Sequence, residues 1–510
     1  MKNRKLRLLM PLLLLMPMAF WVCTNLDETP LSSVTPENFY RTEEELVAAV
    51  IPVYANLLNY SWGDYMFLQE VASDEIFIPQ RGGDWGDGGI WRELQEHKWT
   101  PTHGMVNGAW LAAYTGIARA NSVLENLEKS PSQSPLKPVF TAEVRVLRAF
   151  YYWWLMDLYG GVPVVTAAII DPKNPPKPNT RQEVFTFIVS EINGALPNLQ
   201  TSFGAGNHGR VTRGAAQTLL ATVYLNAEVY TGSPKWSECI AACDAVINSG
   251  AYKLLSNYSD FFKLANEGPN NAESIWVVGH KPQDGVGFLR FMATLHYNQL
   301  PQNPWNGFSV LADFYNKFDT SDVRFKHMLV GPQFVLSGPN AGLPALDRQG
   351  NRLVFTVNSP IVGATEGNGV RILKWQVDPA QSGGNAGNDF AIFRYSHVLL
   401  AKAEALNELN GPSQASIDLI NQVRARSFEP DKPIALANFN AKAALRDRIL
   451  NERGFEFLWE NFRRQDQIRT NHWLEAWTLK SVSDGAHRKL FPVPQAQLDA
   501  NPNLRQNPGY

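Results

Sequence analysis

The sequence is poor in the features that mark a disulfide-stabilised, nucleic-acid-binding or multi-span membrane protein. Its 510 residues contain three cysteines, whereas a secreted disulfide framework carries more, in an even number. The formal net charge is -2, so no basic surface is available to neutralise phosphates, and we expect no nucleic-acid partner. Beyond the N-terminal segment, no apolar run is long enough to cross a bilayer. The length predicts roughly two to four packed units.

Recognisable catalytic motifs are also missing. The sequence contains no Gly-x-Ser-x-Gly elbow, no His-Glu-x-x-His pair and no phosphate-binding loop. A glycoside hydrolase needs two carboxylates about 5–10 Å apart across a sugar cleft, and the aromatic loops described below hold no pair that we can place so. We therefore predict a protein that is not an enzyme, with no cofactor and no metal site. Cys239 and Cys243, four residues apart in a helical pattern, are predicted to be small buried apolar residues.

The N-terminus has the pattern of a secretion signal. Four basic residues precede an apolar run over 8–20, and this order predicts a signal peptide over 1–22. Cys23 closes the run, as the lipidated cysteine of a bacterial lipoprotein does. The preceding Phe20-Trp21-Val22 departs from the small residues usual there, so an ordinary secreted protein is the alternative. Residues 23–36 are polar and contain proline and serine, which predicts a lipid anchor followed by a tether.

The rest of the chain alternates between helical periodicity and irregular sequence. We expect a helical scaffold over 37–254 with a loop over 60–104, an irregular inserted lobe over 255–388, and further scaffold over 389–510. Apolar runs at 274–278 and 352–357 predict short strands in the lobe. The fold class is therefore mainly α. Helical patterns occur at 42–58, 107–127, 140–159, 181–196, 213–230, 236–249, 389–409, 413–427 and 440–469.

A glycine- and tryptophan-rich stretch inside the 60–104 loop is the first candidate binding site. Sugars present apolar C–H faces and a rim of hydroxyls, so their sites combine flat aromatic rings with polar side chains. The glycines between 82 and 89 allow close backbone approach to a ligand. The candidate binding residues of this loop are Arg81, Asp84, Trp85, Asp87 and Trp91.

A second candidate patch lies in the irregular lobe. Here Tyr297, Trp305 and Asn306 alternate aromatic and amide side chains, and Trp305 with Asn306 is expected to pair with the first loop around a cleft. The alternative for both patches is that the tryptophans anchor their loops to the scaffold, since tryptophan is usually highly buried.

Several segments together resemble the SusD-like (RagB/SusD) family. They include Leu-Tyr-Gly-Gly-Val-Pro at 158–163 and the closing Asn-Pro-Gly-Tyr at 507–510. One departure from the family pattern is Asn461, where glycine is usual; asparagine also tolerates the left-handed conformation. The other similar segments are 26–30, 37–40, 143–151, 213–225, 394–405, 421–426, 452–457, 463–466 and 491–502.

The resemblance implies four tetratricopeptide-like helix pairs packed against an irregular lobe. It also implies an outer-membrane lipoprotein, anchored through Cys23 and facing the cell exterior, that captures oligosaccharides for a SusC-like TonB-dependent transporter. Two alternatives stay open: a peptide-binding or scaffolding member of the same family, and a glycoside hydrolase. The aromatic loops distinguish the first prediction from a scaffold, because a scaffold does not need Trp85, Trp91 and Trp305 exposed.

Overall fold

A computed structural model describes residues 39–285 and 287–510 of the chain. The signal peptide predicted over 1–22, the lipidation at Cys23 and the tether over 23–36 lie outside these residues. Among the described residues, no helix combines the length and the apolarity needed to span a bilayer.

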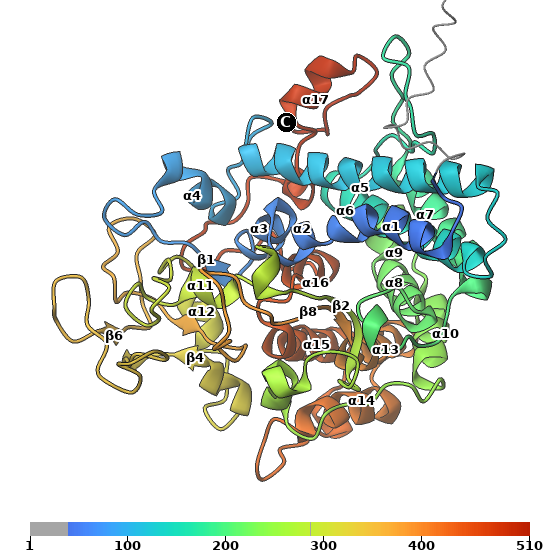
Figure 1. Ribbon diagram of the computed structural model, residues 1–510. Coiled ribbons are helices and arrows are strands. Elements are labelled where there is room, and N and C mark those ends of the chain that lie inside the picture. The colour runs from blue at the N-terminus through green and yellow to red at the C-terminus, as the bar shows by residue number, and fades with distance from the viewer. Residues whose placement is uncertain (1–38, 286) are drawn as a thin grey trace, which may run out of the picture.

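Helices make up most of the regular structure, in agreement with the predicted mainly α class (Figure 1). Those of the first half are α1 (Glu43–Ala55), α2 (Leu58–Ser61), α3 (Asp64–Glu70), α4 (Ile90–Gln95), α5 (Gly104–Lys129), α6 (Lys137–Tyr159), α7 (Arg181–Ala195), α8 (Arg213–Leu225), α9 (Ala227–Thr231) and α10 (Trp236–Ile247). Those of the second half are α11 (Arg290–Thr294), α12 (Ala312–Tyr315), α13 (Tyr395–Asn410), α14 (Gln414–Ala425), α15 (Lys442–Phe457), α16 (Arg463–Arg469) and α17 (Gln495–Ala500).

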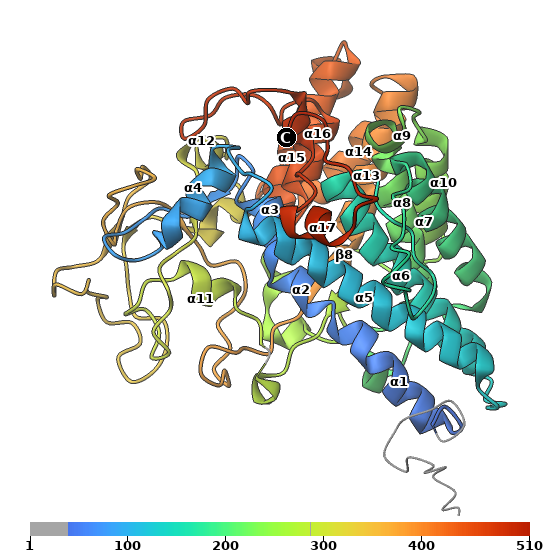
Figure 2. The same ribbon diagram turned by 90° about the horizontal axis from the view of Figure 1, so that it is seen from above.

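The longer helices pack in succession and form the scaffold. Helix α5 packs on α6, α6 on α7, α8 on α10, α10 on α13, and α13 on both α14 and α15. Helix α6 is the centre of this stack, because its side chains from Val146 to Tyr159 are all buried. Thr42 and Thr180 form capping boxes that start α1 and α7, which satisfies backbone N–H groups left free at a helix start. Figure 2 shows these helices on one side of the molecule.

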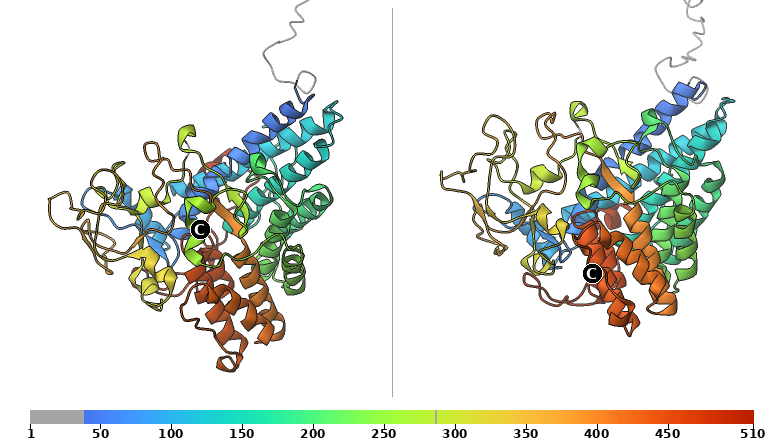
Figure 3. Two further views of the ribbon diagram at one scale, coloured as in Figure 1. Left: turned by 60° about the horizontal axis from the view of Figure 1, so that its bottom comes forward. Right: turned by 90° about the horizontal axis from the view of Figure 1, so that it is seen from below.

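The strands are short and occur only as two-stranded pairs among the described residues. They are β1 (Ile76–Phe77), β2 (Ser274–Val278), β3 (Ser309–Val310), β4 (Met328–Leu329), β5 (Gly331–Pro332), β6 (Val354–Phe355), β7 (Arg371–Ile372) and β8 (Phe390–Arg394). The pairs are β1 with β3, β2 with β8, β4 with β7 and β5 with β6, all antiparallel. Loops dominate this lobe, which lies beside the scaffold helices in both views of Figure 3.

Three details of the predicted elements are wrong. The helix expected over 389–409 begins only at Tyr395, because the preceding residues form β8, buried along its whole length against β2. The loop expected over 60–104 contains α3 and α4. The helix expected over 440–469 is broken between α15 and α16, where Trp459 and Asn461 have φ of 63° and 68°. Asn461 thus adopts the left-handed conformation predicted for it.

Ion pairs that are largely shielded from water join the scaffold helices. Arg145 and Arg148 of α6 both donate to Glu191 of α7, at 3.0 and 2.9 Å. The densest group surrounds Glu456 of α15, which accepts from Arg324, Arg394 and Arg426. We call this group the Glu456 network. Because Arg324 and Arg394 come from the lobe and from β8, the network ties the lobe to the scaffold.

Candidate functional site

The tryptophan-rich loop and the second patch meet directly, as the sequence predicted. The indole N–H of Trp85 donates to the carbonyl oxygen of Trp305 at 2.7 Å. The Tyr297 hydroxyl donates to Asp84 Oδ2 at 2.6 Å. Below these contacts, β1 pairs with β3, so a short ladder fixes how the two segments are aligned. Figures 1 and 2 both place α4, which follows the loop, beside the lobe.

Aromatic rings pack around Trp85, which is half-buried. Its ring lies 5.9 Å from that of Trp91 and 5.9 Å from that of Phe308, both in edge-to-face arrangements. Gly307 lies beneath the indole: a Cβ atom at that position would be 2.5 Å from the Trp85 ring. Trp85 is therefore positioned by its neighbours on one side while part of its ring stays accessible.

The backbone of this loop takes conformations that side chains other than glycine rarely adopt. Gly82, Gly88 and Gly89 have positive φ, as their residue type allows. Trp85 and Asp87 also have positive φ, of 60° and 36°, which costs free energy and persists only where the surrounding structure enforces it. Such conformations concentrate at ligand-binding sites, and their presence here supports the hypothesis that this loop binds a ligand.

An open cavity of about 350 Å³ lies next to the Trp85 ring. Trp85, Asp87, Trp91 and Arg92 line it from the loop, and Ile361 and Val362 line it from the lobe. Aromatic and aliphatic groups with a few polar ones are the usual lining of a small-molecule site. We call this the Trp85 cavity.

The eight predicted binding residues divide into exposed and buried groups. Arg81, Trp91 and Asn306 are only 2%, 7% and 0% exposed. Arg81 donates to Ser309 Oγ at 3.0 Å and to backbone carbonyls, and Asn306 Oδ1 accepts from Arg371. These two side chains hold the loops in place and face no open space, which corrects the expectation that they contact a ligand. Trp91 forms part of the cavity wall and donates from its indole nitrogen to Asp87 Oδ2 at 2.6 Å.

The remaining five residues reach the surface. Asp87 is exposed, and Asp84, Trp85, Tyr297 and Trp305 are half-buried. Asp84 accepts from the Tyr297 hydroxyl and Asp87 accepts from the Trp91 indole. Within residues 39–285 and 287–510, no group of three or more His, Cys, Asp or Glu side chains is placed to hold a metal ion.

Sequence reasoning missed a polar group beside Tyr297. Arg348 stacks its guanidinium 4.2 Å from the centre of the Tyr297 ring and donates to Asp84 Oδ2 at 2.8 Å. It also donates to Glu366, which His296 contacts at 2.9 Å. The Tyr297 hydroxyl and then Arg348 hold the pKa of Asp84 below its ordinary value, so the carboxylate stays charged. We call Asp84, Tyr297, Arg348 and Glu366 the Arg348 cluster.

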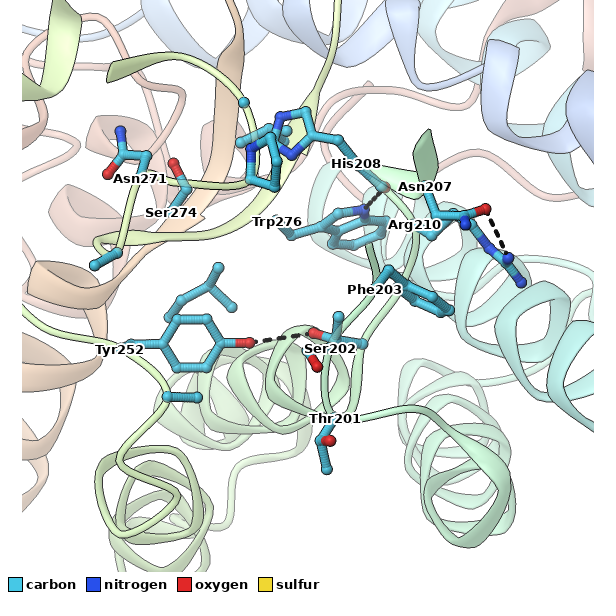
Figure 4. Close-up of a pocket in the computed structure, with 18 residues that line it drawn as sticks. Thr201, Ser202, Phe203, Asn207, His208, Arg210, Tyr252, Asn271, Ser274 and Trp276 are labelled. Carbon is cyan, nitrogen blue, oxygen red and sulfur yellow. Dashed lines mark hydrogen bonds between the residues drawn. The ribbon is translucent and has the colours of Figure 1, made fainter. Parts of the chain in front are cut away.

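Among the further cavities on the scaffold side, two are bordered by aromatic or aliphatic side chains near β2. The rings of Phe203, Tyr252 and Trp276 border a cavity of about 170 Å³ (Figure 4). A larger and mainly apolar cavity of about 670 Å³ lies between α1 and β2, lined in part by Val47, Ile51 and Tyr54. Neither includes a residue that the sequence singled out for binding.

Comparison with known proteins gives the family. Residues 265–510 match the model described as "SusD family", and residues 26–225 match the model described as "Starch-binding associating with outer membrane". The chain belongs to the SusD family. It is 25% identical to the SusD-like protein P25 of Formosa agariphila, with 95% of this chain and 96% of that protein covered. It is also 25% identical to the starch-binding protein SusD of Bacteroides thetaiotaomicron, with 82% and 81% covered.

Solved structures of SusD-like proteins share the fold. A SusD-like protein from Bacteroides fragilis superposes with a TM-score of 0.77 at 20% identity, covering 93% of this chain and 98% of its own. A laminarin-binding SusD-like protein gives a TM-score of 0.74 at 24% identity, covering 92% and 100%. At these identities the structural similarity establishes the SusD fold. The ligand has to be inferred from the geometry of the site.

Proposed function

We propose that this SusD-family protein is a glycan-binding protein whose site is the Trp85 cavity with the adjoining Arg348 cluster. The observation that carries the proposal is Trp85, a partly exposed indole held in a left-handed backbone conformation at the edge of an open cavity. An aromatic ring can stack on the apolar face of a sugar, and the nearby polar side chains can bond its hydroxyls. One relative is a starch-binding protein and another is a laminarin-binding protein, which supports a polysaccharide ligand.

The cellular role that we propose follows the family. The mature chain is anchored through Cys23 to the outer membrane, faces the cell exterior and passes oligosaccharides to a SusC-like TonB-dependent transporter. The pattern of the first 23 residues and the outer-membrane association named in the matched family model support this role. We propose no catalytic activity for the protein.

The test is affinity electrophoresis of the chain from residue 24 onward in gels containing soluble starch, laminarin, xylan or galactomannan. We expect at least one polysaccharide to retard the protein without new reducing ends in the same mixture. Trp85→Ala should weaken that binding at least tenfold, as loss of a tryptophan anchor does. The matched control is Trp236→Ala, a partly buried tryptophan of α10 remote from the site.

The outcomes separate the alternatives. If the Trp85→Ala variant is retarded as strongly as the wild type, the glycan site lies elsewhere on the molecule. No retardation by any of the four polysaccharides would remove the proposal and leave a peptide ligand or a scaffold, whereas new reducing ends would indicate a hydrolase.

A further inference from the structure

The Arg348 cluster is assembled from three segments that are distant in the sequence. Asp84 belongs to the tryptophan-rich loop, Tyr297 to the segment after α11, and Arg348 and Glu366 to the loops that flank β6. The guanidinium of Arg348 lies over the Tyr297 ring, donates from Nε to Glu366 and donates from Nη2 to Asp84. A second bond, from the Arg348 backbone N–H to Glu366 at 3.0 Å, fixes the position of the residue.

This arrangement leaves hydrogen-bonding groups free at the surface. The side chains of Arg348 and Asp84 are 47% and 38% exposed. Within the described parts of the chain, Arg348 Nη1 donates to no group and Asp84 Oδ1 accepts from none. A donor nitrogen and an acceptor oxygen of one ion pair are thus both available to a ligand.

Stability alone gives little reason for such a cluster. Exposed ion pairs contribute little to stability, because water screens them and holding long side chains in place costs entropy. Here the Arg348 guanidinium stacks on Tyr297 and bonds to two carboxylates. The buried ring of His296 contacts one of these carboxylates, that of Glu366. Fixing a side chain before the ligand arrives reduces the entropy lost on binding, so the rigidity benefits recognition.

We propose that Arg348 and Asp84 form a sugar subsite that recognises two adjacent hydroxyl groups of a neutral glycan unit. Arg348 donates to one hydroxyl oxygen, and Asp84 accepts from the other hydroxyl. This inference rests on the proposed glycan-binding function and extends it by naming the chemistry that the ligand presents beside the Trp85 cavity.

The charge of the cluster indicates which sugars it excludes. Two carboxylates, Asp84 and Glu366, share one guanidinium. Burial lowers the pKa of His296, so its ring adds no positive charge at neutral pH. A uronic acid or a sulfate ester placed against Asp84 would meet a carboxylate that is held in its charged form, and like charges in contact are disfavoured.

The test is titration calorimetry of the wild-type chain with soluble starch, laminarin, xylan and galactomannan, which are neutral, and with their sulfated derivatives. For whichever neutral polysaccharide binds, Arg348→Ala should weaken binding about ten- to a hundredfold, the loss expected for a hydrogen bond to a charged group. Arg348→Lys should also weaken it, because lysine keeps the charge and loses the planar set of donors. Sulfation should weaken wild-type binding at least tenfold.

The matched control is Arg352→Ala. Arg352 belongs to the same lobe and also stacks on an aromatic ring, that of Phe334, at 4.7 Å. It lies outside the cluster and should leave binding unchanged. Arg348→Lys also serves as the second variant if Arg348→Ala changes the melting temperature.

Each result decides between the two proposals. If Arg348→Ala and Arg348→Lys bind as wild type while Trp85→Ala does not, the subsite is overturned and the glycan site stands. If the wild type binds only the sulfated derivatives, the neutral-sugar assignment is overturned and glycan binding again stands. If it binds none of the polysaccharides, both proposals fall.

Discussion

Arginine–carboxylate pairs build two regions of this protein that differ in burial and therefore in role. In the Glu456 network, Arg324 Nη1 donates to Glu456 Oε2 at 3.1 Å, and every charged group is shielded from water. In the Arg348 cluster, the same chemistry lies at the surface with donor and acceptor atoms still free. A buried pair must satisfy its own groups, because nothing else reaches them, whereas an exposed pair can exchange water for a ligand.

The largest expected effect comes from breaking the buried region. Although burial by itself raises the pKa of Glu456, Arg426, Arg394 and Arg324 together hold it far below its ordinary value. Glu456→Ala would leave three buried guanidiniums short of a partner, and we expect it to lower the free energy of unfolding by about 3–5 kcal/mol. Chemical denaturation measures this, with the exposed Glu475→Ala as control. A loss below about 1 kcal/mol would contradict the distinction between the two regions.

Glu267 is a third case, a partly buried carboxyl whose main charged neighbour is another carboxylate, that of Asp389. Burial, and then the neighbouring Asp389, raise the pKa of Glu267 to about 9. A carboxyl with a raised pKa binds its proton more tightly in the folded state than in the unfolded state. The contribution of Glu267 to the free energy of unfolding is therefore complete at low pH and falls as pH rises from about 4.5 toward 9. We expect a loss of roughly 2 kcal/mol between pH 6 and pH 8, near the limit of about 1.4 kcal/mol per unit for one proton.

Thermal or chemical unfolding at several pH values checks the Glu267 prediction. Glu267→Gln should flatten the profile between pH 6 and pH 8. The control is Glu238→Gln, since the pKa of Glu238 is lowered and its side chain is 43% exposed. An unchanged slope in Glu267→Gln would assign the pH dependence to another group.

A substitution beneath Trp85 links packing to binding without touching a charge. In Gly307→Ala the new Cβ would lie 2.5 Å from the Trp85 ring, so the indole must move. We expect a stability loss of about 1–3 kcal/mol from overpacking, together with weaker retardation by the glycan. The control is Gly104→Ala at the start of α5, where no atom lies within 4 Å of the new Cβ and φ is not positive, so that alanine replaces glycine without displacing Trp85. Full glycan binding by Gly307→Ala would show that the position of Trp85 does not matter.

The smallest expected effect on stability is at the exposed cluster. Arg348→Ala should change the free energy of unfolding by less than about 1 kcal/mol, because Asp84 can be hydrated and Glu366 keeps its bonds to His296 and to the backbone N–H of residue 348. When both variants are measured in the same denaturant series, Glu456→Ala should lose several times more unfolding free energy than Arg348→Ala. A loss as large as that of Glu456→Ala would mean that the Arg348 cluster is structural.

The tertiary structure decided which polar and aromatic residues of the proposed site reach the surface. Arg81 and Asp84 stand three residues apart in the same loop, yet Arg81 is buried under the lobe while Asp84 reaches the surface. Arg348 lies in a stretch without tryptophan, and its partner Asp84 is 264 residues away. No local pattern in the sequence encodes such a pair, because its two halves meet only after the lobe has folded onto the scaffold.

The sequence by itself determined the helical scaffold and the family, and it singled out the tryptophan-rich loop as a candidate site. Apolar periodicity and capping residues are local signals, and they specify α1, α6 and α7 because a helix satisfies its own backbone bonds. Only the tertiary structure decided that residues 390–394 form a strand, since β8 exists by pairing with β2 more than a hundred residues earlier. The proposed binding surface is also a non-local result, because the exposure of Trp85 and the neighbours of Arg348 depend on how distant segments pack.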